Sequence, residues 1–376
     1  MKRIDLIAGA RPNFVKIASI AGAIADFQAR GHDVSFRLVH TGQHFDPVMS
    51  DAFFEELQIP APDVNLGVRG GSIAEVTSAI MVGYENLLAN ARPDCCLVVG
   101  DVTSTMACAI AAKRANVPLA HVEAGIRSYD MRMPEEINRI VTDAITDWFF
   151  TTSRWAGENL TKTGVPRERI FFVGNTMIDT LLKHREKFRL PHGREFAGLR
   201  HRGYLVLTLH RPSNVDDTTR LREIVEAVCH GADQVPVVFP VHPRTMRSIA
   251  SIAAEWPVNL RLTQALPYLA FNGLVGESLG VLTDSGGITE EATVMGIPCG
   301  TIRESTERPE TVEQGTNELL GTGADRIRDA SARMAAGTWK KGTVPELWDG
   351  RSGARIVDHL WRLLNDAQAI ETGVRR

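Results

Sequence analysis

The chain has 376 residues, of which 44% are hydrophobic and 23% charged, and its 42 basic and 45 acidic side chains leave a net charge of -3. This length predicts two globular domains, because one domain commonly takes about 100–200 residues. The balanced charge argues against nucleic acid as a partner, the start MKRIDLIAGARPN turns polar too early for a signal peptide, and no apolar run is long enough to cross a membrane.

The five cysteines lie in apolar segments and show neither CxxC nor Cys/His metal spacing. They are Cys95, Cys96, Cys108, Cys229 and Cys299. This pattern predicts buried, reduced thiols and no metal site, and it favours the cytoplasm.

Strand and helix patterns alternate through the first half of the chain. Short apolar strands are expected at 3–8, 34–39, 95–99, 118–122, 148–151 and 170–173, and helices at 12–30, 73–89 and 103–114. Strands that are apolar throughout, joined by helices, predict a parallel sheet covered on both faces. We expect this first domain to end near Gly174 and to span 1–174.

The same pattern restarts after residues 187–203, a Pro-, Gly- and Arg-containing segment that we interpret as a surface connection. Strands are expected at 204–209, 235–240, 260–262, 279–283 and 297–302, and a final helix at 354–364. A strand ends in an acid and hydroxyls in both halves, VVGDVTST and VLTDSGGI. The predicted fold class is α/β, with two Rossmann-like doubly wound domains, the second over 175–353, facing a shared cleft.

The stretch HVEAGIRSYDMRMPEEINRI, residues 121–140, gathers acids and bases that a packed core does not need. Glu123 ends an apolar strand, and in open α/β sheets that edge faces the ligand crevice. Pro134 fits the first turn of a helix that carries Glu135 and Arg139. These two are four residues apart and would suit a simple surface ion pair worth about 0.3–0.5 kcal/mol, but their place after a polar loop at a sheet edge favours a site.

The segment LTDSGGITEE is the most specific phosphate-binding pattern. A strand delivers Ser285, Gly286 and Gly287 to the start of a helix, where free N–H groups and the helix dipole suit a diphosphate. Glu291 lies six residues on, about 9 Å along the helix, where a nucleoside ribose would lie. Neither Walker A nor GxGxxG occurs, which argues against an ATPase and weakens a nicotinamide cofactor.

Two further strand ends carry basic groups. Arg11 follows the first strand in GARPNFVK with Lys16 on the helix behind it, and His210 and Arg211 close a strand in LTLHRPSNV. All four suit phosphate recognition, although a solvated lysine and a capping or core histidine remain alternatives. His242 in VFPVHPRT also follows an apolar strand, but the pattern there indicates phosphate recognition less strongly.

Nine motifs occur together and in order: GARPNFVK, TGQHFD, VVGDVTST, HVEAGIRS, MPEEINRI, GNTMIDTLL, LHRPSNV, LTDSGGITEEA and ESTERPETVEQGTN. With them the chain closely resembles the non-hydrolysing UDP-N-acetylglucosamine 2-epimerases over residues 4–321. The resemblance implies a GT-B fold, two Rossmann-like domains around a central cleft with the terminal helix, within 354–376, packing back on the first domain. It also implies a homodimer.

The implied reaction interconverts UDP-N-acetylglucosamine and UDP-N-acetylmannosamine. UDP is eliminated across carbons 1 and 2 to give 2-acetamidoglucal and is then added back with inversion at carbon 2. No cofactor or metal is implied; the reaction needs acid and base groups near the sugar and firm holding of the leaving diphosphate.

The resemblance also assigns residues. The catalytic set is Asp101, Glu123, Glu135 and His210; the UDP-sugar contacts are Arg11, Lys16, Arg139, Arg211, Phe271, Ser285, Gly286, Gly287, Glu291 and Arg308. Asp101 and Glu135 are expected in proton transfer, Glu123 in sugar positioning or as a third proton-transfer group, and His210 near the leaving phosphate. Some members bind a second UDP-sugar as an activator, and Gln43, His44 and His242 are compatible with that site, although Asp46 stands where those members have a glutamine.

Several alternatives stay open at this stage. Related epimerases act on UDP-2,3-diacetamido-glucuronate or on 6-deoxy sugars, and the TERPE motif modestly favours the N-acetylglucosamine branch. A hydrolysing epimerase, a GT-B glycosyltransferase and a non-catalytic sugar-nucleotide sensor are the others; the carboxylates and His210 argue against the last. The product is expected to supply a cell-envelope polysaccharide.

Overall fold

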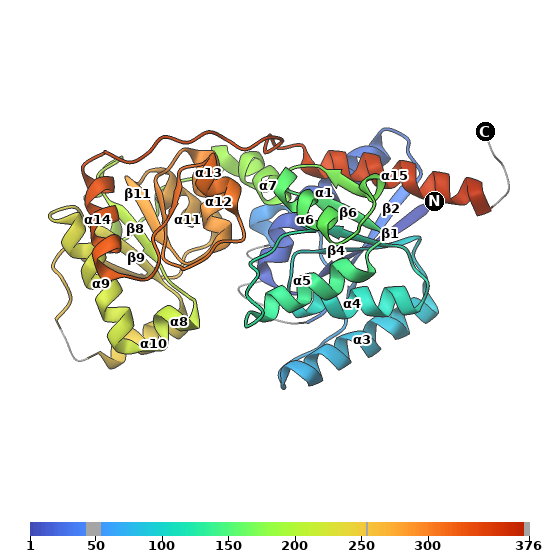
Figure 1. The fold of residues 1–376 in the computed structure, drawn as a ribbon, viewed down its shortest axis with the longest axis horizontal. Coiled ribbons are helices and arrows are strands. Elements are labelled where there is room, and N and C mark those ends of the chain that lie inside the picture. The colour runs from blue at the N-terminus through green and yellow to red at the C-terminus, as the bar shows by residue number, and fades with distance from the viewer. Residues whose placement is uncertain (43–53, 253–254, 372–376) are drawn as a thin grey trace. The chain divides into compact units, whose positions relative to one another are not determined.

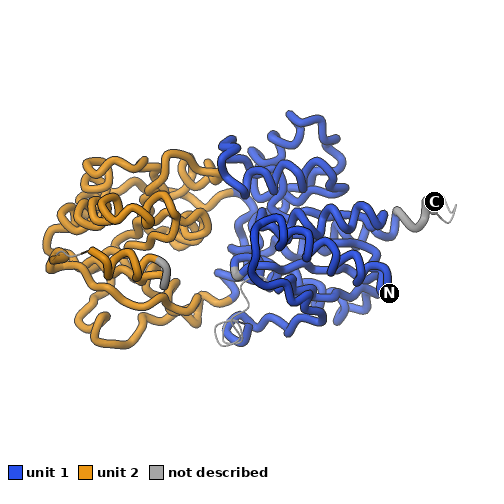
Figure 2. The backbone as a smooth tube through the Cα atoms, turned by 90° about the horizontal axis from the view of Figure 1, so that it is seen from below, with its two compact units in different colours: residues 1–183, 346–376 blue, residues 184–345 orange. Residues whose placement is uncertain are grey.

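The computed structural model describes residues 1–42, 54–252 and 255–371 (Figure 1). Contacts divide the chain into two compact units, residues 1–183 with 346–376, and residues 184–345 (Figure 2). We call them unit 1 and unit 2 and describe each by itself.

Unit 1 is built on a parallel sheet with strand order β3-β2-β1-β4-β5-β6-β7. Its strands are β1 (Lys2–Ala8), β2 (Val34–His40), β3 (Val64–Asn65), β4 (Cys95–Val99), β5 (Leu119–Val122), β6 (Trp148–Thr151) and β7 (Ile170–Phe172). Its helices are α1 (Arg11–Ala29), α3 (Ile73–Asn90), α4 (Thr103–Arg114), α5 (Pro134–Ile145), α6 (Arg154–Lys162), α7 (Thr176–His184) and α15 (Ser352–Glu371). In Figure 1, α1 and α15 cover one face of the sheet and α3 and α4 the other, which buries every residue of β4.

The strand order of unit 1 reverses between β1 and β4. At such a switch point the two neighbouring connections leave for opposite faces of the sheet and open a crevice at the carboxyl ends of the strands. The turn before α1 and the turn after Val99 therefore flank the natural ligand position of this unit.

Unit 2 repeats the plan with strand order β10-β9-β8-β11-β12-β13. Its strands are β8 (Leu205–Thr208), β9 (Val237–Val241), β10 (Leu260–Gln264), β11 (Gly280–Thr283), β12 (Cys299–Thr301) and β13 (Asn317–Leu319). Its helices are α8 (Pro212–Val215), α9 (Thr218–Ala232), α10 (Pro243–Ser251), α11 (Tyr268–Gly276), α12 (Gly286–Met295), α13 (Pro309–Glu313) and α14 (Ala324–Ala335). Apolar residues of α9 and α14 pack on one face, and those of α11 and α12 on the other. The switch point lies between β8 and β11, so the segments after Thr208 and Thr283 meet there.

The predicted fold class is confirmed, and each strand expected from the apolar pattern is present within a few residues of its expected ends. Two strands had no signal in the sequence, β3 and β13. Each is an edge strand of two or three residues with a polar residue in it, too short for a periodic pattern.

The C-terminal segment returns to unit 1 through side chains that fasten it to the sheet and to α1. The indole Nε1 of Trp348 donates to the carbonyl of Thr152 at 3.0 Å. Asp179 accepts from the N–H of Gly353 at 2.7 Å and from Ser19 Oγ of α1 at 2.6 Å. The packing of α15 on α1 is thus directed by specific hydrogen bonds at its first turn.

Gly174 allows the returning chain to approach β7 closely. Its φ is +91°, and a Cβ there would lie 2.1 Å from the carbonyl oxygen of Leu347. Gly164 has a similar φ of +90° with open space around it. We expect Gly164→Ala to cost only the left-handed strain of about 1–2 kcal/mol, and Gly174→Ala to cost about 1–3 kcal/mol more through overlap. Thermal unfolding of both variants measures the difference; equal midpoints would show that Leu347 moves aside freely.

Candidate functional site

The turn after β4 carries Asp101 and is held from two sides. The N–H of Gly100 donates to the carbonyl of Val122 at 3.0 Å, and Asn138 Nδ2 of α5 donates to the carbonyl of Asp101 at 2.8 Å. Asn13 of α1 donates to the carbonyl of Val99 at 2.9 Å. These bonds fix the backbone of Asp101 at the switch point of unit 1.

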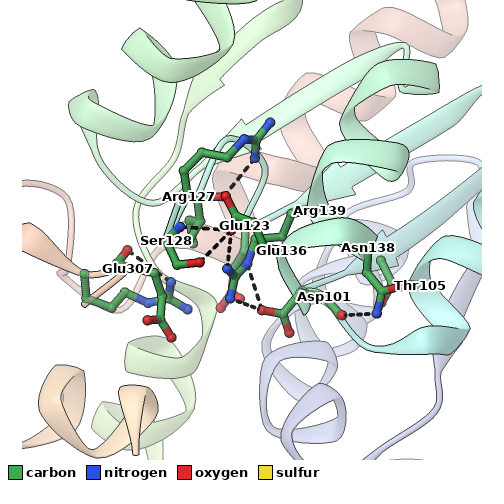
Figure 3. Close-up of polar contacts among 12 residues, drawn as sticks. Asp101, Thr105, Glu123, Arg127, Ser128, Glu136, Asn138, Arg139 and Glu307 are labelled. Atoms are coloured by element: carbon green, nitrogen blue, oxygen red, sulfur yellow. Dashed lines mark hydrogen bonds and ion pairs between the residues drawn. The ribbon is translucent and has the colours of Figure 1, made fainter. Parts of the chain in front are cut away.

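The Asp101 side chain is clamped by a buried arginine from α5. Nε and Nη2 of Arg139 both donate to Asp101 Oδ2, at 2.9 and 2.5 Å, and Nη1 donates to Glu136 Oε2 at 2.7 Å (Figure 3). The Arg139 side chain is 4% exposed, whereas that of Asp101 is 27% exposed. Arg139 therefore links an enclosed carboxylate, Glu136, to one that remains open to a ligand.

Glu123 at the end of β5 is paired with Lys16 of α1. Lys16 Nζ lies 2.6 Å from Glu123 Oε2, and both side chains are buried. The φ of Glu123 is +67°, a strained conformation for a residue with a Cβ. Strain of this kind persists only where the surroundings impose it, and it is concentrated at functional sites.

Glu135 lies half-buried in the first turn of α5 and precedes the buried residues Glu136 and Arg139 in the sequence. Arg139 bonds to Asp101 and Glu136, so it does more than a simple surface pair with Glu135 would. The buried face of α5 is polar, while Ile137 and Ile140 are exposed. A helix that turns charged groups inward is the opposite of ordinary packing and marks a site.

Unit 2 places His210 against a carboxylate at its own switch point. Asp284, fully buried after β11, accepts from the backbone N–H groups of His210 and Arg211 at 3.1 and 2.9 Å and from Asn214 Nδ2 at 3.1 Å. His210 Nδ1 lies 2.8 Å from Asp284 Oδ1 and its side chain is 46% exposed. Burial opposes ionisation of Asp284, but the His210 hydrogen bond and charge, aided by the other donors, hold its pKa below the ordinary value.

The predicted phosphate element begins α12. Ser285 is the N-cap residue, and Gly286 and Gly287 form the first turn, partly exposed. The N–H of Ser285 donates to Thr283 Oγ1 at 3.0 Å. The N–H groups of Gly286 and Gly287 have no partner inside the helix by geometry, and with the helix dipole they suit an anion. A Cβ at Gly286 would lie 3.2 Å from Glu307 Oε1, so glycine keeps this approach open.

A second turn of α12 carries two buried glutamates. Glu291 accepts from Tyr268 Oη at 2.7 Å, and burial raises its pKa to about 7, with Glu290 adding to the rise and Tyr268 and Asn272 opposing it. Glu290 accepts from Arg308 Nε at 2.5 Å. Arg308 is thus oriented by a helix that also carries the glycines.

The remaining predicted residues are placed as follows. Phe271 on α11 is half-buried against the apolar cluster under β8 and β11. His242 is exposed after β9. Gln43, His44 and the side chain of Arg11 lie outside the described residues.

Sequence reasoning missed the partners that orient the site. Asp284 stands in the quoted motif LTDSGG, and its resemblance to VVGD at another strand end was a usable signal. Glu136 and Glu290 each stand next to a predicted residue. Glu136 lies one helical turn before its partner Arg139, whereas Glu290 meets its partner Arg308 only after the chain has folded.

Within the described ranges, no group of three or more His, Cys, Asp or Glu residues is arranged to hold a metal ion. No described helix is both long and apolar enough to span a membrane.

A sequence profile of the UDP-N-acetylglucosamine 2-epimerase family matches residues 27–361. The chain is 40% identical to a UDP-2,3-diacetamido-2,3-dideoxy-D-glucuronate 2-epimerase of Pseudomonas aeruginosa, over 96% of this chain and all of that protein. It is 34% identical to a UDP-N-acetylglucosamine 2-epimerase of Methanocaldococcus jannaschii, over 94% of this chain and 98% of that one. A crystal structure of an enzyme of that name and organism, in complex with UDP-GlcNAc and UDP, matches with a TM-score of 0.83 over 95% of this chain and 99% of that one.

These likenesses define a GT-B-like sugar-nucleotide isomerase. The chain belongs to the UDP-N-acetylglucosamine 2-epimerase family.

The raised pKa of Glu291 predicts how unit 2 responds to pH. Because the native carboxyl holds its proton up to about pH 7 and the unfolded one only to about 4.5, the native state binds more protons between these values. Stability then falls as pH rises through this window, by up to about 1.4 kcal/mol per pH unit from this group. Glu291→Gln should flatten the pH dependence of the urea midpoint, since glutamine still accepts from Tyr268.

The exposed Glu223→Gln on α9 is the matched control and should leave the slope unchanged. An unchanged slope in Glu291→Gln as well would show that Glu291 is ionised in the native protein throughout this range.

Proposed function

We propose that the protein interconverts UDP-N-acetylglucosamine and UDP-N-acetylmannosamine by eliminating UDP and adding it back with inversion at carbon 2. The observation that carries the proposal is the pair of carboxylates, Asp101 and Glu123, at adjacent strand ends, each held by a buried cation. Such carboxylates suit proton transfer and positioning at a sugar carbon because each group is oriented before the substrate arrives.

The hydrogen on carbon 2 has no neighbouring carbonyl to acidify it, so departure of UDP must assist its removal. In the proposal Asp101 and Glu135 move protons at carbon 2. Glu123, fixed by Lys16, positions the sugar or acts as a third proton-transfer group. Arg139 supports the charge of Asp101 and is kept in the proposed substrate-binding set through that carboxylate.

UDP would be held by unit 2. Gly286 and Gly287 offer their N–H groups to the diphosphate, Ser285 contributes its side-chain hydroxyl, and Arg308 adds a cation. Glu291 is assigned to the ribose and Phe271 to the base. Asp284 accepts a hydrogen bond from Nδ1 of His210, which leaves the Nε2 atom of the ring to face the leaving phosphate. The next residue, Arg211, is proposed to bind the same phosphate.

One observation favours a second substrate. The 40% identical relative is named for UDP-2,3-diacetamido-2,3-dideoxy-D-glucuronate. The same elimination and re-addition would serve that sugar, since the change at carbon 2 is identical and only the groups on carbons 3 and 5 differ.

Finer points are part of the same proposal. We infer a homodimer, cytoplasmic and supplying a cell-envelope polysaccharide; the five buried free thiols support a reducing compartment. Gln43, His44 and His242 are proposed for a second, regulatory UDP-sugar site. Light scattering of the purified chain tests the dimer.

Proton NMR in deuterated water tests the reaction. With UDP-N-acetylglucosamine we expect UDP-N-acetylmannosamine to appear with deuterium at carbon 2, because the intermediate takes its new proton from solvent through the enzyme. Asp101→Asn and Glu135→Gln should lower kcat by about 10²–10⁴-fold, as loss of a general acid or base does.

The exposed Glu158→Gln on α6 serves as the control and should react like wild type. Free N-acetylmannosamine together with UDP would identify a hydrolysing epimerase instead. A product without deuterium would rule out the elimination route.

A substrate comparison decides between the two sugars. We expect kcat/KM for UDP-N-acetylglucosamine to exceed that for UDP-2,3-diacetamido-2,3-dideoxy-D-glucuronate when both are assayed by the same NMR experiment. The reason is that Lys16, Arg127 and Arg139 are each engaged by a carboxylate of the protein, with which the uronate would have to compete. A ratio that favours the uronate would assign the protein to the second substrate.

A further inference from the structure

A buried histidine lies directly beneath the two carboxylates at the strand ends. His121, the third residue of β5, is fully buried two residues before Glu123. Its Nε2 is 2.9 Å from the carbonyl oxygen of Gly100, the residue before Asp101. Its Nδ1 is 2.7 Å from Asp143 Oδ1 on α5.

Both partners of the imidazole are hydrogen-bond acceptors. The Gly100 carbonyl can only accept, so Nε2 carries a proton. Asp143 already accepts from the N–H of Gly125 at 3.1 Å and pairs with Arg127 at 2.7 Å, as an ionised carboxylate does. Contact of an ionised carboxylate with Nδ1 requires a proton there too, which makes the ring an imidazolium.

We propose that His121 is a positioning residue of the epimerase reaction, held as an imidazolium that ties the Asp101 turn to the Glu123–Arg127 turn through Asp143. One N–H holds the Gly100–Asp101 peptide. The other holds Asp143, which in turn fixes Gly125 and Arg127 and so supports the strained backbone of Glu123. The inference rests on the proposed function for its effect on rate, but not for the protonation state of the ring.

The first test is NMR of the full-length chain with its histidine ring nitrogens labelled with nitrogen-15, near neutral pH. His121 should show a directly bonded proton on both ring nitrogens, and its signals are assigned by their loss in His121→Gln. A single protonated nitrogen would overturn the proposal. This measurement needs no substrate, and a variant is needed only to assign the His121 signals.

The second test separates a positioning role from a purely structural one. A glutamine amide can replace the Nε2 bond to Gly100, and an asparagine amide the Nδ1 bond to Asp143, but neither carries the charge. In both variants kcat should fall by about 10- to 100-fold with KM changed less than about threefold, because a small misplacement of the reacting groups costs rate and not UDP binding. His192→Gln, exposed in unit 2, is the control.

Wild-type kcat in both variants, or a loss confined to KM, would overturn the proposal. A wild-type chain that epimerises neither UDP-sugar would refute the proposed function, and the NMR result would still decide the state of His121. The two failures are therefore distinguishable.

Discussion

The strand-end edge of unit 1 that carries Asp101 and Glu123 depends on keeping several carboxylates charged inside a protein. An isolated buried carboxylate would take up a proton, because the interior solvates charge poorly. Here each one is matched with a cation: Glu123 with Lys16, Asp143 with Arg127, and Asp101 and Glu136 with Arg139. The cations come from α1, from the turn after β5 and from α5, so the charges also fasten these segments to one another.

This requirement explains the unusual construction of α5. Its inward face carries Glu136, Arg139 and Asp143, while two isoleucines face outward. A charged inner face contributes little to stability by itself, because desolvation offsets most of the attraction between paired ions. What the arrangement supplies is fixed geometry: Arg139 cannot move without breaking bonds to both Asp101 and Glu136.

Unit 2 meets a different demand, since the anion it is proposed to hold is a diphosphate ligand and not a side chain. It presents backbone N–H groups at the start of α12 and keeps its acids away from that point or paired. Asp284 is surrounded by donors, Glu290 is bonded to Arg308, and burial favours the neutral form of Glu291. The two units thus share a fold and a switch-point position, but unit 1 places its own carboxylates there, whereas unit 2 presents backbone N–H groups there.

The sequence by itself determined the fold class, nearly all of the strands and the strand ends at which polar residues gather. Apolar runs of four to seven residues between helical patterns are a local signal, and a parallel sheet carries the ends of such runs to one edge wherever they lie in the chain. The motif resemblance then named the residues proposed for chemistry. Tertiary structure alone decided the pairing: that Arg139 serves Asp101 from 38 residues away, that Lys16 serves Glu123 from 107 away, and that His121 bridges Gly100 and Asp143. No periodicity or spacing encodes these contacts, because they depend on which helix lies over which strand end after the sheet has formed.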